Sequence, residues 1–183
     1  MQAFTLTYDG LARVLISDVG LSTPYNPANG IKAPEHTIKA IWDTGATMSV
    51  LTKKSVSKLK LLPSGKVLAK NTSEEKLRDS YIVNIYLPNK LMIAFVKVID
   101  CEDILGDADM LIGMDIITLG DFALTNKNGK TVFSFVIPSM DTIDYVEKTN
   151  RINSQSPLLK RIEDEKQRRL LNASRLHKKK RRK

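Results

Sequence analysis

The sequence predicts a mainly β, barrel-like domain followed by a basic tail. Short segments in which apolar and polar residues alternate recur between turn signals through the first 140 residues, a pattern typical of β-strands. The charged residues are also unevenly distributed between the two parts of the chain. Residues 1–150 carry 16 Lys and Arg against 17 Asp and Glu, whereas residues 151–183 carry 13 against 3. We therefore expect a mainly β, barrel-like domain at residues 1–140 and a basic, partly helical or disordered C-terminal extension at residues 141–183.

The first strands follow from alternation and turn residues. Phe4, Leu6 and Tyr8 alternate with threonines, and Asp9-Gly10 is a turn signal. We therefore expect residues 11–19 to return as the second strand of a hairpin. The three prolines of residues 21–35 indicate a loop, and residues 36–42 form the next strand.

The remaining elements are expected further along the chain, with only one or two short helices. Residues 52–62 predict a helix that Pro63 and Gly65 end. Ser156-Pro157 can start a second helix in the tail. The expected strands lie in a meander over residues 66–99, and in a hairpin of residues 122–125 and 131–135 around Asn128-Gly129.

One stretch carries the strongest chemical signal. Asp43-Thr44-Gly45-Ala46-Thr47 follows the apolar strand that ends at Trp42. We expect Gly45 to adopt backbone angles that residues with a Cβ resist, so that the turn presents the carboxylate of Asp43 rigidly. About seventy residues later comes a second, apolar motif, Leu111-Ile112-Gly113.

Together the two motifs resemble the retropepsins, the retroviral-type branch of the aspartic proteases. The resemblance implies a retropepsin-like closed β-barrel (the acid-protease fold) with Asp43 as the catalytic residue. It implies that Thr44, Gly45, Ala46 and Thr47 support the active site and that Leu111, Ile112 and Gly113 are the second signature beneath it. It also implies a flap hairpin near residues 67–82, although this segment lacks the glycines of retroviral flap tips. Where retroviral enzymes have an ion pair, this chain has Thr47-Met48 and Met114-Asp115, and Asp115 is expected to cap the following helix.

Peptide hydrolysis of this kind needs two carboxylates that share a proton, and the chain has one Asp-Thr-Gly. The sequence therefore predicts a homodimeric aspartic endopeptidase, in which each chain supplies one Asp43 to activate water against a polypeptide substrate. Two alternatives stay open. The fold could serve as a non-catalytic module for dimerisation or peptide binding, or the basic tail could bind nucleic acid or another acidic partner.

Other classes of function find little support in the sequence. With one cysteine and two histidines, a zinc site is not expected, and the spacing of Asp107, Asp109, Asp115 and Asp121 does not match a calcium loop. We therefore expect no metal and no cofactor. The chain lacks an apolar run of ~20 residues and a signal-peptide pattern, so we expect a cytoplasmic protein without a membrane partner.

Overall fold

The computed structural model of the protein describes residues 1–30, 32–70, 75–154, 157, 161–162 and 164–170. These residues belong to two compact units, Met1–Met140 and Asp141–Lys183.

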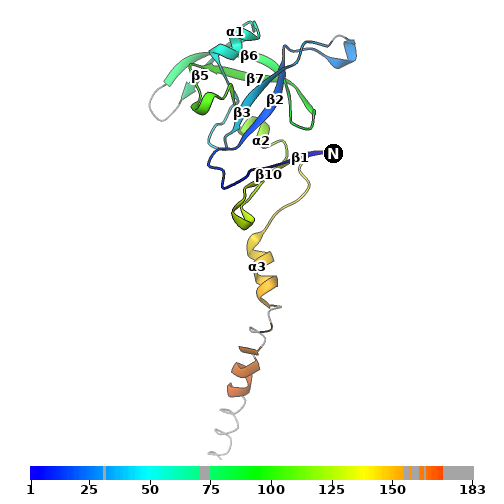
Figure 1. The fold of residues 1–183 in the computed structure, drawn as a ribbon, viewed down its shortest axis with the longest axis vertical. Coiled ribbons are helices and arrows are strands. Elements are labelled where there is room, and N and C mark those ends of the chain that lie inside the picture. The colour runs from blue at the N-terminus through cyan, green and yellow to red at the C-terminus, as the bar shows by residue number, and fades with distance from the viewer. Residues whose placement is uncertain (31, 71–74, 155–156, 158–160, 163, 171–183) are drawn as a thin grey trace, which may run out of the picture. The chain divides into compact units, whose positions relative to one another are not determined.

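The first unit is mainly β, as the alternating sequence predicts (Figure 1). Its strands are β1 (Gln2–Thr7), β2 (Ile16–Ser22), β3 (His36–Trp42), β4 (Val50–Thr52), β5 (Gly65–Lys70), β6 (Glu75–Tyr86), β7 (Met92–Cys101), β8 (Met110–Ile112), β9 (Asp121–Thr125) and β10 (Val132–Ile137). The α-helices of this unit are α1 (Lys53–Lys58) and α2 (Met114–Ile117), and 3-10 turns lie at Pro27–Asn29, Leu105–Asp107 and Lys127–Gly129.

Six strands close into a barrel in the order β2-β3-β8-β4-β7-β6, because β6 pairs again with β2. The expected closed barrel is confirmed. Two of its neighbouring pairs, β3–β8 and β4–β7, are parallel, and each joins segments that lie far apart in the chain. This parallel pairing brings the end of β3, where the Asp43 turn begins, beside the end of β8, where Gly113 follows.

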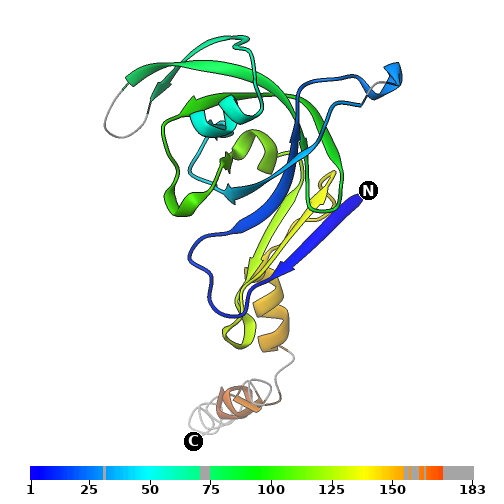
Figure 2. The same cartoon turned by 45° about the horizontal axis from the view of Figure 1, so that its top comes forward.

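The strand β5 lies outside the closed ring and pairs with β6 alone (Figure 2). The two strands form a hairpin with Gly65 opposite Ser80 and Lys70 opposite Glu75. The expected meander over residues 66–99 is therefore confirmed as β5, β6 and β7. The flap segment expected near residues 67–82 falls on this hairpin, and residues 71–74 at its bend lie outside the described residues.

The expected hairpin between the first two strands is wrong. β1 pairs with β10 in a separate three-stranded sheet, β1-β10-β9, whereas β2 pairs with β3 and β6 in the barrel. The chain leaves one sheet for the other between Tyr8 and Ile16, and side-chain contacts hold this crossing. The Tyr8 hydroxyl accepts from the Ile16 N–H (3.1 Å), and the Thr131 hydroxyl oxygen accepts from the Ala12 N–H (2.9 Å). β2 also extends to Ser22, so the loop begins later than expected.

Aromatic side chains join the small sheet to the barrel. Trp42 is buried with its ring centroid 5.0 Å from that of Phe133 and 5.1 Å from that of Phe135. Phe4 lies 5.7 Å from Trp42, and the indole N–H donates to the Ser17 hydroxyl (2.9 Å). Trp42 is therefore a core residue, as expected, and it anchors the strand that leads to Asp43.

The first expected helix is shorter than predicted, and the second unit contains one helix more than expected. Thr52 caps α1 by accepting from the Ser55 N–H (3.2 Å), so the predicted helix over 52–62 holds only for Lys53–Lys58. In the second unit, α3 (Tyr145–Ser154) is a helix that was not expected. The described residues from Pro157 on, which are 157, 161–162 and 164–170, are helical, as the helix expected from Ser156-Pro157 predicts, and Ser156 itself lies outside the described residues. The basic run of residues 178–183 also lies outside them, so its nucleic-acid contact stays a prediction. Within the described part of the chain, no helix is long and apolar enough to cross a membrane.

Candidate active site

The Asp43 turn is fixed by its backbone. The N–H of Asp43 donates to the Ile112 carbonyl (2.9 Å), which ties the turn to β8, and the N–H of Ala46 donates back to the Asp43 carbonyl (3.2 Å). The carboxylate oxygen Oδ1 of Asp43 accepts from the Gly45 N–H (2.8 Å). The side chain is thereby oriented by its own turn, and it stays half-buried at the surface of the unit.

The reason for glycine at position 45 differs from the one expected. Gly45 is not among the glycines with a positive φ, so an unusual backbone angle does not explain it. A Cβ there would instead lie 3.1 Å from Asp43 Oδ1, tighter than ordinary contact. Gly45 therefore leaves room for the carboxylate to fold back on its own turn.

The second signature packs directly beneath this turn. The N–H of Met114 donates to the Ala46 carbonyl (2.8 Å). A Cβ on Gly113 would lie 2.7 Å from the carbonyl carbon of Met48 and 2.9 Å from the Ala46 oxygen, so only glycine fits here. Leu111 and Ile112 belong to β8 beside β3, and Ile112 is fully buried. The predicted motifs at residues 43–47 and 111–113 are thus in contact.

A buried serine and an acidic residue lock the two motifs together. Asp115 accepts from both the N–H (3.0 Å) and the hydroxyl (2.8 Å) of Ser49, and the Ser49 hydroxyl oxygen accepts from the Gly113 N–H (3.1 Å). Asp115 also accepts from the Ile116 N–H (3.1 Å). The expectation that Asp115 precedes and caps its helix is wrong: it lies within α2, with Gly113 at the N-cap, and binds across to Ser49.

Asp43 lies on the wall of a cleft of about 1180 Å³. The walls come from the Asp43 turn, the end of β7 with the segment after it, and the β5–β6 hairpin. Most of the lining side chains near the turn are apolar, including Ile41, Val50, Ile99 and Leu111. Such a groove suits an extended, partly apolar chain segment.

Asp43 also lines a smaller hollow of about 320 Å³. It is lined by Thr44, the apolar side chains of Trp42, Phe122 and Leu124, and the segment 12–15. Asp43 therefore borders both spaces. The side chains of Thr44 and Thr47 are exposed and that of Ala46 is half-buried.

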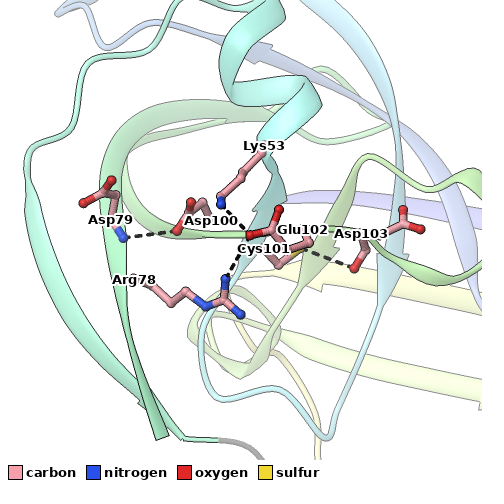
Figure 3. Close-up of polar contacts among 7 residues, drawn as sticks. All are labelled: Lys53, Arg78, Asp79, Asp100, Cys101, Glu102 and Asp103. Carbon is pink, nitrogen blue, oxygen red and sulfur yellow. Dashed lines mark hydrogen bonds and ion pairs between the residues drawn. The ribbon is translucent and has the colours of Figure 1, made fainter. Parts of the chain in front are cut away.

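Sequence reasoning missed a charged cluster beside the cleft, of which Arg78 is the member that lines it. Lys53 from α1 and Arg78 from β6 both approach the carboxylate of Glu102, which follows β7 (Figure 3). The hydrogen bond from Lys53, more than the charge of Arg78, holds the pKa of Glu102 below its usual value. Lys76 and Arg78 alternate with Leu77, and this pattern could have shown that the cations share one face of the strand.

Other titratable groups of the cleft lie at the end of β7. The carboxylate of Asp100 is buried and accepts from the Asp79 N–H (3.1 Å). Cys101 is half-buried, and burial raises the pKa of its thiol. Among the described residues, no group of three or more His, Cys, Asp or Glu side chains could hold a metal ion.

No family model matches the chain, and no curated protein does either. Among solved structures the chain is similar to a retropepsin-like aspartic protease from Rickettsia conorii, with 13% identity, a TM-score of 0.45, and coverage of 74% of this chain and 94% of that one. It is similar to the EIAV protease in complex with the inhibitor HBY-793, with 19% identity, a TM-score of 0.43, and coverage of 61% of this chain and 91% of that one. It is also similar to the retroviral protease-like domain of Ddi1 from Leishmania major, with 17% identity, a TM-score of 0.37, and coverage of 71% of this chain and 100% of that one. These are proteins of the kind that the two sequence motifs resemble.

Proposed function

We propose that the protein is an aspartic endopeptidase that acts as a homodimer, with Asp43 as the catalytic residue of each chain. The observation that carries this proposal is the setting of Asp43. Its carboxylate is oriented by a turn that β8 and Gly113 support from below, and it borders a cleft large enough for a peptide segment. A turn aspartate that only capped backbone groups would need no such cleft.

The chemistry needs a second carboxylate close to the first. Two carboxylates a few ångström apart cannot both ionise, so the pair shares one proton. The ionised member takes a proton from water, and the protonated member polarises the scissile carbonyl. We propose that the second carboxylate is Asp43 of another copy of the chain, related by a two-fold axis near the turn.

The surroundings of Asp43 suit this arrangement. An axis beside Asp43 would bring the exposed Thr44 and the smaller hollow toward the same surface of the partner. The cleft would stay open for the substrate, and the β5–β6 hairpin would cover it and reduce access of water. We also propose a reducing, cytoplasmic location, in keeping with a single cysteine.

The test is cleavage of a diverse peptide mixture between pH 4 and pH 7, read by mass spectrometry. Wild type is compared with Asp43→Asn and with a control, Asp18→Asn, which removes an exposed acid of β2. Sedimentation measures whether each protein is a dimer. We expect defined cuts by wild type and by Asp18→Asn, and a loss of at least about a thousandfold in rate for a dimeric Asp43→Asn.

Two outcomes would contradict the proposal. Cleavage by Asp43→Asn at the wild-type rate would remove Asp43 from the mechanism. A stable wild-type dimer that binds extended peptides without cutting any of them would instead identify a peptide-binding module.

A further inference from the structure

Two cations of the β5–β6 hairpin face the cleft. Lys76 and Arg78 both line it, as do Ala69 and Val67, which lie opposite them in the register of the hairpin. Leu77 lies between the two cations and is 57% exposed. Since successive side chains of a strand point to opposite faces, the hairpin directs both charges into the space that Asp43 also borders.

Arg78 has the more defined setting of the two. Its side chain is only 15% exposed, and its Nη1 lies 3.8 Å from Glu102 Oε1. This separation is too long for a hydrogen bond but short enough for electrostatic attraction. Lys53 contacts the same oxygen more closely, and the side chain of Glu102 is 63% exposed (Figure 3). Glu102 is therefore held chiefly by Lys53.

We propose that Arg78 is a specificity-determining residue that binds an acidic side chain, Asp or Glu, of the peptide substrate. This inference rests on the proposed endopeptidase function. A guanidinium stays charged at every relevant pH, and its planar set of five donors matches a carboxylate in two parallel hydrogen bonds. Because Arg78 lies on a cleft wall and is largely shielded from water, its charge is screened less than an exposed one. Near Asp43 the lining is mainly apolar, so the predicted substrate carries an acidic residue at the hairpin and apolar residues beside the scissile bond.

Two other carboxylates of the cleft favour the opposite specificity. Asp100 and Asp103 also line the cleft and would attract a basic side chain. Both already accept backbone hydrogen bonds, Asp100 from the Asp79 N–H (3.1 Å) and Asp103 from the Ile104 N–H (2.9 Å). The lone pairs of Asp100 and Asp103 are thus partly engaged in these bonds. This favours recognition of an acidic substrate side chain by Arg78 over recognition of a basic one by the two carboxylates. A preference for basic substrates remains the outcome that would overturn the proposal.

A purely structural role for Arg78 makes a different prediction. If Arg78 only held the hairpin through its contacts with neighbouring residues, Arg78→Gln would lower the activity toward Glu and Gln peptides alike. If Arg78 binds the substrate, Arg78→Gln lowers the activity toward the Glu peptide selectively. Arg78→Gln removes the receptor for the acidic side chain, whereas Glu102→Gln removes a carboxylate that competes for it.

The experiment uses full-length protein and one peptide sequence, amidated at its C-terminus, with Glu, Gln or Lys placed in turn at each position around the scissile bond. A further peptide with Gln at these positions and a free C-terminus distinguishes an acidic side chain from a terminal carboxylate. We measure kcat/KM for wild type and the equilibrium affinity of Asp43→Asn for the same peptides. The binding readout separates the proposals: if nothing is cut but the Glu peptide is still bound preferentially, the endopeptidase fails and the acidic subsite stands.

At one position we expect wild type to prefer Glu over Gln by roughly tenfold or more. Arg78→Gln should abolish this preference, Arg78→Glu should shift it to Lys, and Glu102→Gln should keep or increase it. The control Lys66→Gln, which removes an exposed cation of β5 paired with Asp79, should leave the preference unchanged. Equal rates and affinities for Glu and Gln peptides, a preference for Lys or for the free C-terminus, or an equal loss toward Glu and Gln peptides in Arg78→Gln would overturn the proposal.

Discussion

Replacing Ser49 by alanine is expected to destabilise the first unit by about 2–4 kcal/mol. Ser49 is fully buried between the two motifs of the candidate site. Its hydroxyl donates to the Asp115 carboxylate (2.8 Å), and a lost hydrogen bond to a charged group costs about 1.5–3 kcal/mol. The same hydroxyl accepts from the buried Gly113 N–H (3.1 Å), and leaving this donor without its partner adds about 1 kcal/mol. The Ser49 N–H keeps its own bond to Asp115, so the network is weakened but not removed.

Urea unfolding followed by the fluorescence of Trp42 measures this effect, because Trp42 is the only tryptophan and is buried beside the turn. A loss of this size corresponds to a fall in Tm of roughly 6–15 °C for a unit of this length. Ser57→Ala on the exposed face of α1 is the matched control and should change the free energy of unfolding by less than about 0.5 kcal/mol. If Ser49→Ala were as mild as Ser57→Ala, the serine would not lock the two motifs, and the reasoning would be refuted.

Two further predictions concern neighbouring residues. Gly113→Ala should cost about 1–3 kcal/mol or more and lower the activity of the folded fraction, because its Cβ would meet the backbone of Met48 at 2.7 Å; a soluble variant with wild-type stability in urea would contradict this. Since burial raises the pKa of Cys101, its thiol should alkylate more slowly at pH 7.5 than in the unfolded chain, and a cleft-bound peptide should slow it further. The folded rate should rise only at a pH above that at which the unfolded thiol ionises, so this group contributes no stability at neutral pH and disfavours the folded state at higher pH. Mass spectrometry of the labelled chain measures both rates, and equal rates in folded and unfolded protein would count against the buried thiol.

Alternation predicted most strands because it is a local property of the sequence. The three strands of the meander and the last hairpin follow directly from the spacing of apolar residues and from turn residues such as Asn128-Gly129. Closure of the barrel was also expected. The contact between residues 43–47 and 111–113 was expected through the resemblance, which supplied a long-range pairing that periodicity does not contain.

The errors arose where distant segments decide the structure. A turn signal at Asp9-Gly10 predicts a hairpin, but β1 finds its partner in β10, about 130 residues away, and no local pattern encodes that choice. Arg78 was overlooked for a related reason. In sequence alone, a cation in a polar strand segment indicates that this face of the strand points to solvent. Only the register of β5 with β6 reveals that the face carrying Arg78 borders the cleft.

The parallel pairings of the barrel also determine when the candidate site can exist. The turn at Asp43 is held by Ile112, Gly113 and Met114, and these residues reach it only after β8 has paired with β3. Contacts between segments so distant in sequence form late in folding, since the entropy of closing the intervening loop is lost first. During synthesis on the ribosome, therefore, the chain cannot hold Asp43 in its native turn until residues through about 117 have left the exit tunnel. The proposed endopeptidase would thus be inactive as a nascent chain, because the residues that hold its turn are synthesised after it.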